Sequence, residues 1–289
     1  MSQKRTVIEN VRPSVDQGRY PAKRIVGDTV RVTADIYADG HDLLRAVVRY
    51  RKAGGRKWSE AEMELIQNDA WAGTFPVDEL GSYEFQIEAW VDHYDTWVDG
   101  LEKKAEVESE SDVDLAIGAL LLDGAAERAG TDSAAATRAG KLLREAARFL
   151  EATDAPLRER AGRALEEGVI RLARTYPDRS LASRSEPALS ITVDPPLARF
   201  SAWYELFPRG VYDDKSDHGT FRSVMAHLDY VSSMGFDVLY LPPIHPIGLA
   251  YRKGRNNGLV ADADDPGSPW AIGGPEGGHT AIHPALGTA

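Results

Sequence analysis

The stretch from Asp237 to Asn257 constrains the fold more than any other part of the chain. It opens with the apolar run 238–241, which predicts a short buried strand. Pro242 and Pro243 end this strand, because proline has no N–H to give to a sheet. A basic, amide-rich loop follows. A buried strand that delivers a polar loop to one end of a sheet is typical of α/β enzymes, and a solvated loop without a ligand explains these residues equally well.

The residues before this stretch extend the same pattern. Residues 199–207 predict an apolar strand that contains one acid, Glu205. Thr220 is placed to cap a helix whose apolar residues repeat on one face. Strand, helix and strand joined by tight turns predict a βα unit of a parallel sheet. The loops after Pro208 and Pro242 then lie at the carboxyl ends of strands, where barrel enzymes place their sites.

The N-terminal segment, residues 1–94, predicts an antiparallel β-sandwich. Residues 29–37 alternate apolar and polar side chains with period two, and similar short runs follow at 46–51, 58–66, 70–77 and 82–91. Six aromatic residues lie in these runs, either as a platform for stacking sugars or as core. We favour the core, because they follow the strand alternation. They are Trp58, Trp71, Phe75, Tyr83, Phe85 and Trp90.

The middle segment, residues 95–185, predicts a helical bundle. The charged run 102–110 is expected on a solvated helix surface, and Ser111 or Asp112 is placed to cap the next helix. A further cap is expected among residues 131–133, and a last helix is expected to start near Pro156. The loops are short, so the helices are expected to be antiparallel neighbours that serve packing or a subunit interface.

Composition excludes several classes of function. A length of 289 residues predicts more than one domain, and a net charge of −11 disfavours a general nucleic-acid or anionic-membrane binder. The chain has no cysteine, which excludes disulfides and thiolate chemistry and fits a reducing cytoplasm. We find no signal peptide and no apolar run near the ~20 residues of a membrane span.

Four stretches in residues 200–288 carry a resemblance to one family. They read FSAWYELFPR (200–209), GTFRSVMAHLDYVSSMGFDVLYLPPIHPIG (219–248), RKGRNN (252–257) and DPGSPWAIGGPEGGHTAIHPALGT (265–288). In these motifs the chain resembles the GlgE maltosyltransferases of the α-amylase superfamily. The resemblance implies transfer of maltosyl units from α-maltose 1-phosphate to the non-reducing ends of α-1,4-glucans, in the synthesis of α-glucan.

The same resemblance implies the fold and its incompleteness. Residues 186–289 would hold the first two βα units of a (β/α)₈ TIM barrel, after the sandwich and the bundle. The family works by a retaining mechanism with a carboxylate nucleophile and a carboxylic acid/base. Both would lie beyond Ala289, so no catalytic residue is assigned and the chain is expected to be an inactive fragment by itself. The resemblance also implies a homodimer, and the composition predicts a cytoplasmic location.

Lys253 and Asn257 match positions of the family's RKGRNN loop that hydrogen-bond the maltosyl unit. Asn256 and His279 are further candidates for substrate contact. An ammonium and an amide suit sugar hydroxyls, which both give and accept hydrogen bonds. His245, His279 and His283 match no zinc signature, so neither a metal nor a cofactor is expected.

Two alternatives stay open. The chain could derive from a related α-amylase-family hydrolase or transglycosylase, although RKGRNN and the stretch 268–284 resemble the sugar-phosphate enzyme more closely. It could also be a non-catalytic module that uses the sandwich and the bundle for assembly with a partner.

Overall fold

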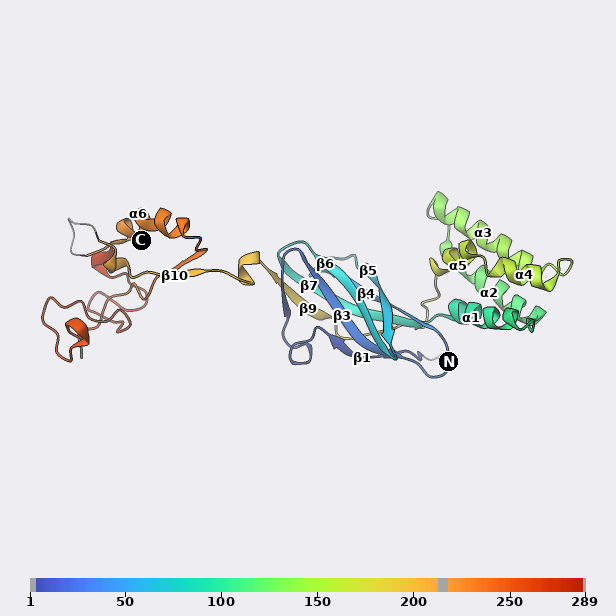
Figure 1. Ribbon diagram of the computed structural model, residues 1–289, viewed down its shortest axis with the longest axis horizontal. Helices are drawn as coiled ribbons and strands as arrows, with labels where there is room; N and C mark the ends of the chain where they lie inside the picture. Colours follow the sequence, from blue (N-terminus) through green and yellow to red (C-terminus); the bar gives the residue numbers. More distant parts are fainter. Residues whose placement is uncertain (1–3, 213–217, 288–289) are drawn as a thin grey trace. The chain divides into compact units, whose positions relative to one another are not determined.

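The computed structural model describes residues 4–212 and 218–287. The chain divides into two compact units, Met1–Asp194 and Pro195–Ala289. The strands of the first unit are β1 (Val7–Arg12), β2 (Ala22–Ile25), β3 (Asp28–Tyr37), β4 (Leu44–Lys52), β5 (Ser59–Gln67), β6 (Ala70–Val77), β7 (Gly81–Val91), β8 (Ser183–Arg184) and β9 (Leu189–Asp194). Its helices are α1 (His93–Glu106), α2 (Asp112–Ala129), α3 (Ala134–Glu151), α4 (Leu157–Ala164) and α5 (Glu167–Arg174) (Figure 1). The second unit contains β10 (Trp203–Glu205), α6 (Phe221–Ser233) and β11 (Val238–Tyr240).

The strands of the first unit form one curled, mainly antiparallel sheet. Its order is β1-β3-β6-β5-β4-β7-β9-β2, and β8 pairs with β7. The predicted antiparallel β region is confirmed, but as one continuous sheet, because β5 pairs with both β4 and β6 (Figure 1). The region is therefore sandwich-like, and it does not consist of the two separate sheets of a β-sandwich.

Strand β3 shows how the sequence forms the core of the sheet. Its alternate residues point inward and are buried, and Val30 lies opposite Phe75 of β6 in the antiparallel register. The same core cluster includes Phe85 of β7 and Ile191 of β9, so the inner faces on both sides of the curl share one core. The core interpretation of the aromatic residues holds for the buried Trp71, Phe75, Tyr83, Phe85 and Trp90. Trp58 is half-buried beneath the guanidinium groups of Arg49 and Arg51.

Four strands of this sheet were not predicted from the sequence: β1, β2, β8 and β9. The short β9 matters most, because it follows the whole helical segment and then pairs with β7 on one side and β2 on the other. Its Ile191 and Val193 are buried in the sheet core. Pairings across more than a hundred residues leave no local periodicity to read.

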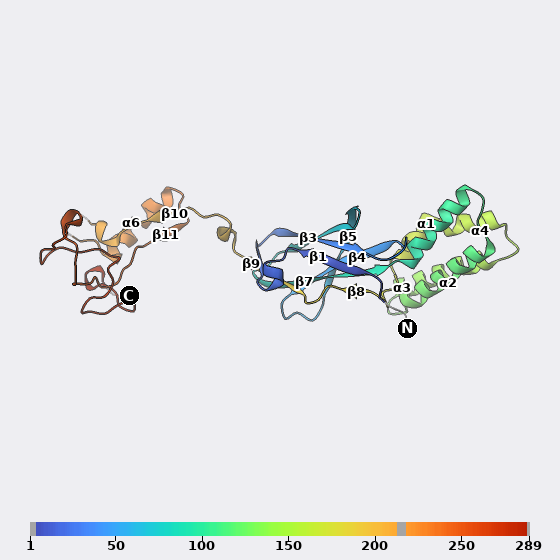
Figure 2. The ribbon, with the colours of Figure 1, turned by 90° about the horizontal axis from the view of Figure 1, so that it is seen from below.

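The helical segment forms a bundle with its own core. Figure 2 shows its helices α1 to α4 from a second direction. The predicted cap of α2 is confirmed: Ser111 and Asp114 form a reciprocal capping box, and Ser133 caps α3. Two expectations hold only in part. Residues 102–106 of the charged run lie on α1 and are mostly exposed, as predicted, but the helix begins after the cap residue Asp92 and ends at Glu106, before the end of the run. The single helix predicted to start near Pro156 is two short helices in the structure, α4 and α5, which are separated at Leu165–Glu166.

The second unit contains the predicted strand–helix–strand arrangement. Strands β10 and β11 are parallel, with Trp203 opposite Val238, and α6 lies between them in sequence. Thr220 caps α6 through a capping box with Ser223, as the sequence predicts. The predicted strand 199–207 shrinks to the three residues of β10. No described helix combines the length and the apolar character needed to cross a bilayer.

Candidate functional site

The loop after β11 contains a tight turn at residues 254–258. The backbone N–H of Gly254 donates to the carbonyl of Gly258 at 3.0 Å, and that of Gly258 donates to the carbonyl of Arg255 at 3.0 Å. A Cβ atom at Gly254 would lie 2.2 Å from the carbonyl oxygen of Val260, so only glycine fits there. Asn256 and Asn257 adopt left-handed backbone angles, with φ of 53° and 63°, which asparagine tolerates well.

The buried carboxylate of Asp265 stabilises this turn through two hydrogen bonds. One of its oxygens accepts from the Arg255 Nε at 3.2 Å, and the other accepts from the backbone N–H of Asp262 at 2.9 Å. The N–H of Asp262, together with Arg255, keeps the pKa of Asp265 below its ordinary value. Arg252 donates to the carbonyl of Pro266 at 3.0 Å. Arg252 and Arg255 of the RKGRNN loop therefore contribute to its shape through these contacts.

The turn brings three of the four predicted site residues together. Lys253 is half-buried, whereas Asn256 and Asn257 are exposed. One ammonium and two amides thus stand within residues 252–258, which we call the 252–258 turn. The backbone of its last five residues is held by its own hydrogen bonds. This set offers several hydrogen-bond donors and two carbonyl acceptors, which is the mixture that a hydroxyl-rich ligand needs.

The fourth predicted residue, His279, belongs to a different segment. It is exposed, and its ring lies 5.7 Å from that of His245. His245 Nδ1 lies 2.9 Å from the carbonyl oxygen of Ala281, so it orders the segment 273–287. The His283 side chain accepts from the backbone N–H of Ala285 at 3.2 Å. These contacts agree with loop-ordering roles for His245 and His283.

The sequence analysis missed the buried guanidinium of Arg209. Both of its terminal nitrogens are buried and have no hydrogen-bond partner among the described residues. Burial, and after it the positive charge of Arg252, lowers the pKa of Arg209. Burial also lowers the pKa of His283, with a contribution from Arg209. Such a guanidinium favours a nearby carboxylate or other anionic acceptor. In the sequence, Arg209 is one residue of FPRG, where nothing signals burial.

Two other chemistries find little support in this unit. Glu205 lies at the exposed end of β10, opposite Tyr240 of β11. Within residues 4–212 and 218–287, histidine, aspartate and glutamate side chains form no group of three or more that could hold a metal ion. The amides and the ammonium within residues 252–258 therefore make a candidate site for a hydroxyl-rich ligand.

Comparison with known proteins identifies the family. A family model described as α-1,4-glucan:maltose-1-phosphate maltosyltransferase, domain N/S, matches residues 4–195. Proteins named α-1,4-glucan:maltose-1-phosphate maltosyltransferase are 43% identical over 285 residues in Chlorobaculum tepidum and 46% identical over 285 residues in Myxococcus xanthus. These matches cover 99% and 97% of this chain. The chain spans 41% and 42% of the length of those two curated relatives, respectively. The chain belongs to the family of α-1,4-glucan:maltose-1-phosphate maltosyltransferases.

Proposed function

We propose that residues 1–289 are the N-terminal part of an enzyme that transfers maltosyl units from α-maltose 1-phosphate to α-1,4-glucans. The family match and the names of the relatives support this reaction. The three-segment organisation belongs to the proposal: a β region over 1–94, a bundle over 95–185, and the start of a (β/α)₈ barrel within 186–289. The barrel part begins at Pro195 rather than at 186, because β9 pairs with β7 and β2 in the sheet of the first unit. The parallel β10–α6–β11 unit supports the last segment.

The observation that carries the proposal is the pre-formed turn at 254–258. Lys253 and Asn257 hydrogen-bond hydroxyl groups of the maltosyl unit, and Asn256 and His279 make further contacts. The turn is held by its own backbone bonds and by Asp265, so little ordering is needed when the sugar binds. Lys253 contributes donors without requiring a charged partner on the sugar.

Turnover by this reaction requires two carboxylates on either side of the glycosidic bond. We assign neither of these carboxylates to residues 1–289. Glu205, at the exposed end of β10, is a single carboxylate, and the reaction needs two. The chain by itself therefore binds sugar but does not release phosphate. The mechanism of the complete enzyme is retaining, through a glycosyl-enzyme intermediate. Its action is cytoplasmic, in keeping with a chain that has no cysteine.

The assembly that we propose is a homodimer joined through α2. This helix buries one apolar face in the bundle and exposes another, at i, i+4 and i+7. The exposed residues are Val113, Ile117 and Leu120. A second copy would cover this face. Sedimentation should show a dimer that Ile117→Lys dissociates, whereas Leu142→Lys, on the exposed side of α3, leaves it intact. A monomer at every concentration would refute this assembly.

The test of the function measures binding and turnover separately. The 289-residue chain is titrated with maltose and α-maltose 1-phosphate, and phosphate release is followed with a malto-oligosaccharide acceptor. We expect binding without release, and a loss of affinity of about tenfold in Lys253→Met and in Asn257→Ala. Lys103→Met, an exposed lysine on α1, is the matched control.

Each alternative has its own signature in these measurements. Phosphate release by the 289-residue chain would show that the catalytic groups lie within it. Hydrolysis of malto-oligosaccharides without use of the sugar phosphate, in a longer protein, would favour an α-amylase-type hydrolase. No sugar binding at the loop would favour a non-catalytic assembly module.

A further inference from the structure

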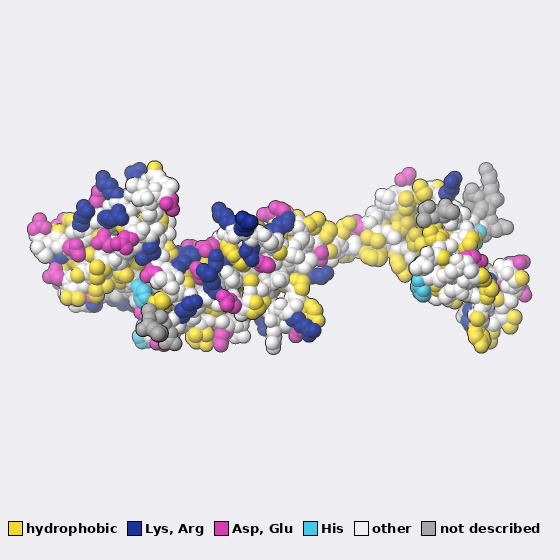
Figure 3. Space-filling model, turned by 180° about the vertical axis from the view of Figure 1, so that it is seen from behind, with side chains coloured by type: hydrophobic (Ala, Val, Ile, Leu, Met, Phe, Trp, Pro, Cys, Tyr) yellow, Lys and Arg dark blue, Asp and Glu magenta, His cyan; other side chains and the backbone are white. Residues whose placement is uncertain are grey.

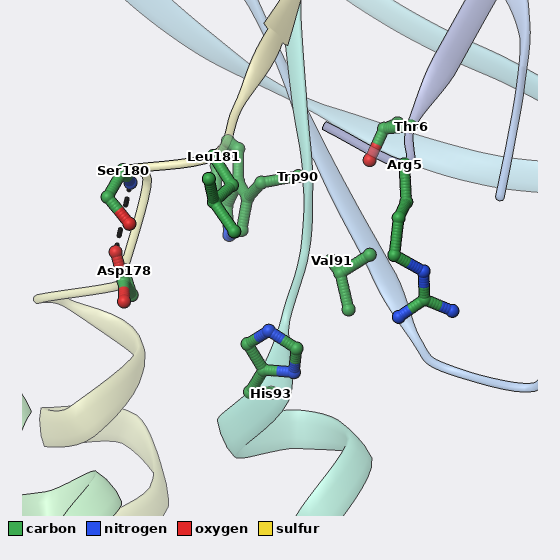
Figure 4. A pocket seen from close by; sticks show the side chains of 8 residues that line it. All are labelled: Arg5, Thr6, Trp90, Val91, His93, Asp178, Ser180 and Leu181. Atoms are coloured by element: carbon green, nitrogen blue, oxygen red, sulfur yellow. Dashed lines mark hydrogen bonds between the residues drawn. The ribbon is translucent and has the colours of Figure 1, made fainter. Parts of the chain in front are cut away.

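Two neighbouring cavities lie where the curled sheet meets the helical bundle in the first unit. One has a volume of about 40 Å³ and is lined by Trp90 and Leu181, among others. The other has a volume of about 220 Å³ and is lined by Tyr94 and Leu121, among others. His93 and Asp178 line both. We call the two cavities together the junction site. Figure 4 shows the side chains of Trp90, His93 and Asp178, from three different segments, around the smaller cavity.

Each cavity has a buried polar group in its wall that lacks a partner. The indole nitrogen of Trp90, a residue 1% exposed, has no hydrogen-bond partner among the described residues. The same is true of the hydroxyl of Tyr94, which is 9% exposed. Buried donors in folded proteins are nearly always paired, with protein or with a bound molecule. Two such groups beside adjacent cavities point to a ligand.

The surroundings of these two groups restrict how they can be satisfied. Arg179 lies over the Trp90 ring at 4.3 Å from its centroid, so stacking on that ring is already provided by the protein. The N–H at the ring edge is the group left to bind. Burial, with the charge of Asp95, raises the pKa of Tyr94, so its hydroxyl keeps its proton and can donate.

The rest of the lining supplies acceptors and balanced charge. The backbone N–H of Ser180 donates to Asp178 Oδ1 at 2.9 Å and lowers the pKa of that carboxyl, which is therefore ionised and has a second oxygen to accept with. Arg128 uses Nε to donate to the carbonyl of Tyr176 at 2.9 Å and retains its terminal amino groups. The charged lining comprises three guanidinium groups, of Arg5, Arg128 and Arg174, and two carboxylates, of Asp92 and Asp178. Three of these groups pair with residues outside the lining: Arg5 with Asp39 and Asp42, Arg174 with Asp95, and Asp92 with Arg45. One group of each sign, Arg128 and Asp178, is left to face a ligand.

This balance distinguishes between classes of ligand. A site for an anion or a cation would carry a surplus of the opposite charge, whereas Arg128 and Asp178, the charged lining groups without an outside ion-pair partner among the described residues, balance each other. A purely apolar ligand would leave the two donors unpaired. Hydroxyl groups accept from the indole and the phenol and donate to the carboxylate, while leucines such as Leu121 contact the C–H faces of a ring.

We propose that the junction site binds a small neutral polyol, a sugar of one or two rings, to which Trp90 and Tyr94 donate and Asp178 accepts. The proposal does not depend on the function assigned to the 252–258 turn, because it rests on residues of the first unit alone. Substitutions at that turn and at the junction site therefore test the two proposals independently.

The experiment follows the indole N–H resonance of Trp90 in the 289-residue chain during titration with glucose and with maltose. The resonance is assigned by its absence in Trp90→Phe. We expect a saturable shift at millimolar sugar and a rise in Tm with sugar concentration. Tyr94→Phe and Asp178→Asn should each weaken binding by roughly tenfold, the effect of one lost hydrogen bond in a buried site.

The controls separate binding from folding. Tyr94→Phe removes only a hydroxyl that has no hydrogen-bond partner in the part of the chain that the structure describes. The variant should therefore fold as well as the parent without sugar, and sugar should no longer raise its Tm. Tyr20→Phe, an exposed tyrosine outside both cavities, and Lys253→Met should leave the Trp90 titration unchanged. No Trp90 shift with either sugar, an equal Tm rise in Tyr94→Phe, or a response to phosphate or acetate instead of sugar would overturn the proposal.

Discussion

Residues 4–194 and residues 195–287 differ in how fully they bury their own apolar side chains. The first region has one core inside the sheet and another inside the bundle. In the second, the buried aliphatic side chains described are Val224, Val231, Ile247 and Leu286. Large side chains there remain at the surface: Phe200 is 78% exposed and Trp203 is 60% exposed. Figure 3 shows hydrophobic side chains over the surface of this unit.

The difference shows what an amphipathic pattern does and does not fix. Helix α6 has a cap and apolar residues at helical spacing, yet its Met225 is 68% exposed. Helix α3 has the same kind of pattern and buries Leu143 and Leu150 completely, because α2 and α4 lie against it. A local sequence pattern thus determines that a helix forms, whereas the stability of that helix depends on the residues that cover its apolar face. The first region should therefore be self-sufficient and the second should not.

The largest expected effect comes from cutting the chain at the end of the first region. Residues 1–194 should fold cooperatively by themselves, because β9 completes the sheet. Ending instead at residue 185 removes β9, with the buried Ile191 and Val193 and their pairing to β7 and β2. We expect a loss of about 5 kcal/mol or more in the free energy of unfolding, measured by urea denaturation. Equal stability of the two forms would show that the first region does not need β9.

The next effect tests the charged outer face of the sheet. Glu88 on β7 is 3% exposed and accepts from Arg49 at 3.2 Å and from Arg184. Glu88→Ala leaves these guanidinium groups without their carboxylate and should cost about 3–5 kcal/mol. Glu84→Ala, on the same strand, breaks a more exposed pair with Arg51 and should cost about 1 kcal/mol or less. Equal losses in thermal unfolding would contradict this difference between the two pairs.

The parts of the fold that were predictable are those with a local cause. Period-two alternation predicted β3 and β6 nearly residue by residue, and the caps at Ser111, Ser133 and Thr220 follow from side chains adjacent to their helices. Strand β9 could not be predicted in the same way, because its partners β7 and β2 come from distant parts of the sequence. The parallel pairing with β2 in an otherwise antiparallel sheet has no sequence signal.

In the candidate site, too, the features with a local cause were predictable and those that depend on tertiary contacts were not. The resemblance identified Lys253 and Asn257, and the turn that holds them follows from glycine and asparagine in RKGRNN. The support from Asp265 and the burial of Arg209 depend on tertiary contacts, so the sequence did not indicate them. The unpaired groups of Trp90 and Tyr94 are likewise visible only in three dimensions, since each residue by itself predicts core.

A moderate effect is expected from close helix packing in the first region. A Cβ atom at Gly118 of α2 would lie 2.0 Å from the indole of Trp97, whose Nε1 donates to the carbonyl of Asp114 at 2.8 Å. Gly118→Ala should therefore cost about 1–3 kcal/mol by overpacking, despite the better helix propensity of alanine. Gly162→Ala in α4 has open space at this position and should be neutral or stabilise by up to about 1 kcal/mol. Stabilisation by both substitutions would show that α1 and α2 are not in firm contact.

A smaller effect compares the same capping motif in the two regions. Ser111 begins α2 and Thr220 begins α6, each in a capping box. Replacing either residue by alanine should cost its helix about 1 kcal/mol. For Ser111→Ala, we expect the loss to appear in the cooperative unfolding of the first region. For Thr220→Ala, it should appear as faster hydrogen exchange within α6 only. A global shift from Thr220→Ala would show that the two regions unfold together.

The smallest expected effect is a pH dependence present in one capping box and absent from the other. The hydrogen bond from Lys104, together with that from Ser111, lowers the pKa of Asp114 in the α2 box. A folded-state pKa below the unfolded value of about 3.9 gives stability that is present above that pH and is lost as pH falls through the folded pKa. Asp114→Asn should therefore cost less than about 1 kcal/mol near neutral pH, because an ion pair with an exposed lysine such as Lys104 contributes little. The difference in unfolding free energy between this variant and the parent should shrink below about pH 4.

The α6 box provides the control, because it has the uncharged Ser223 in the position of Asp114. Ser223→Ala should therefore show no such convergence over the same pH range. A stability difference for Asp114→Asn that stays constant down to pH 2 would show that the carboxylate charge contributes nothing to the cap.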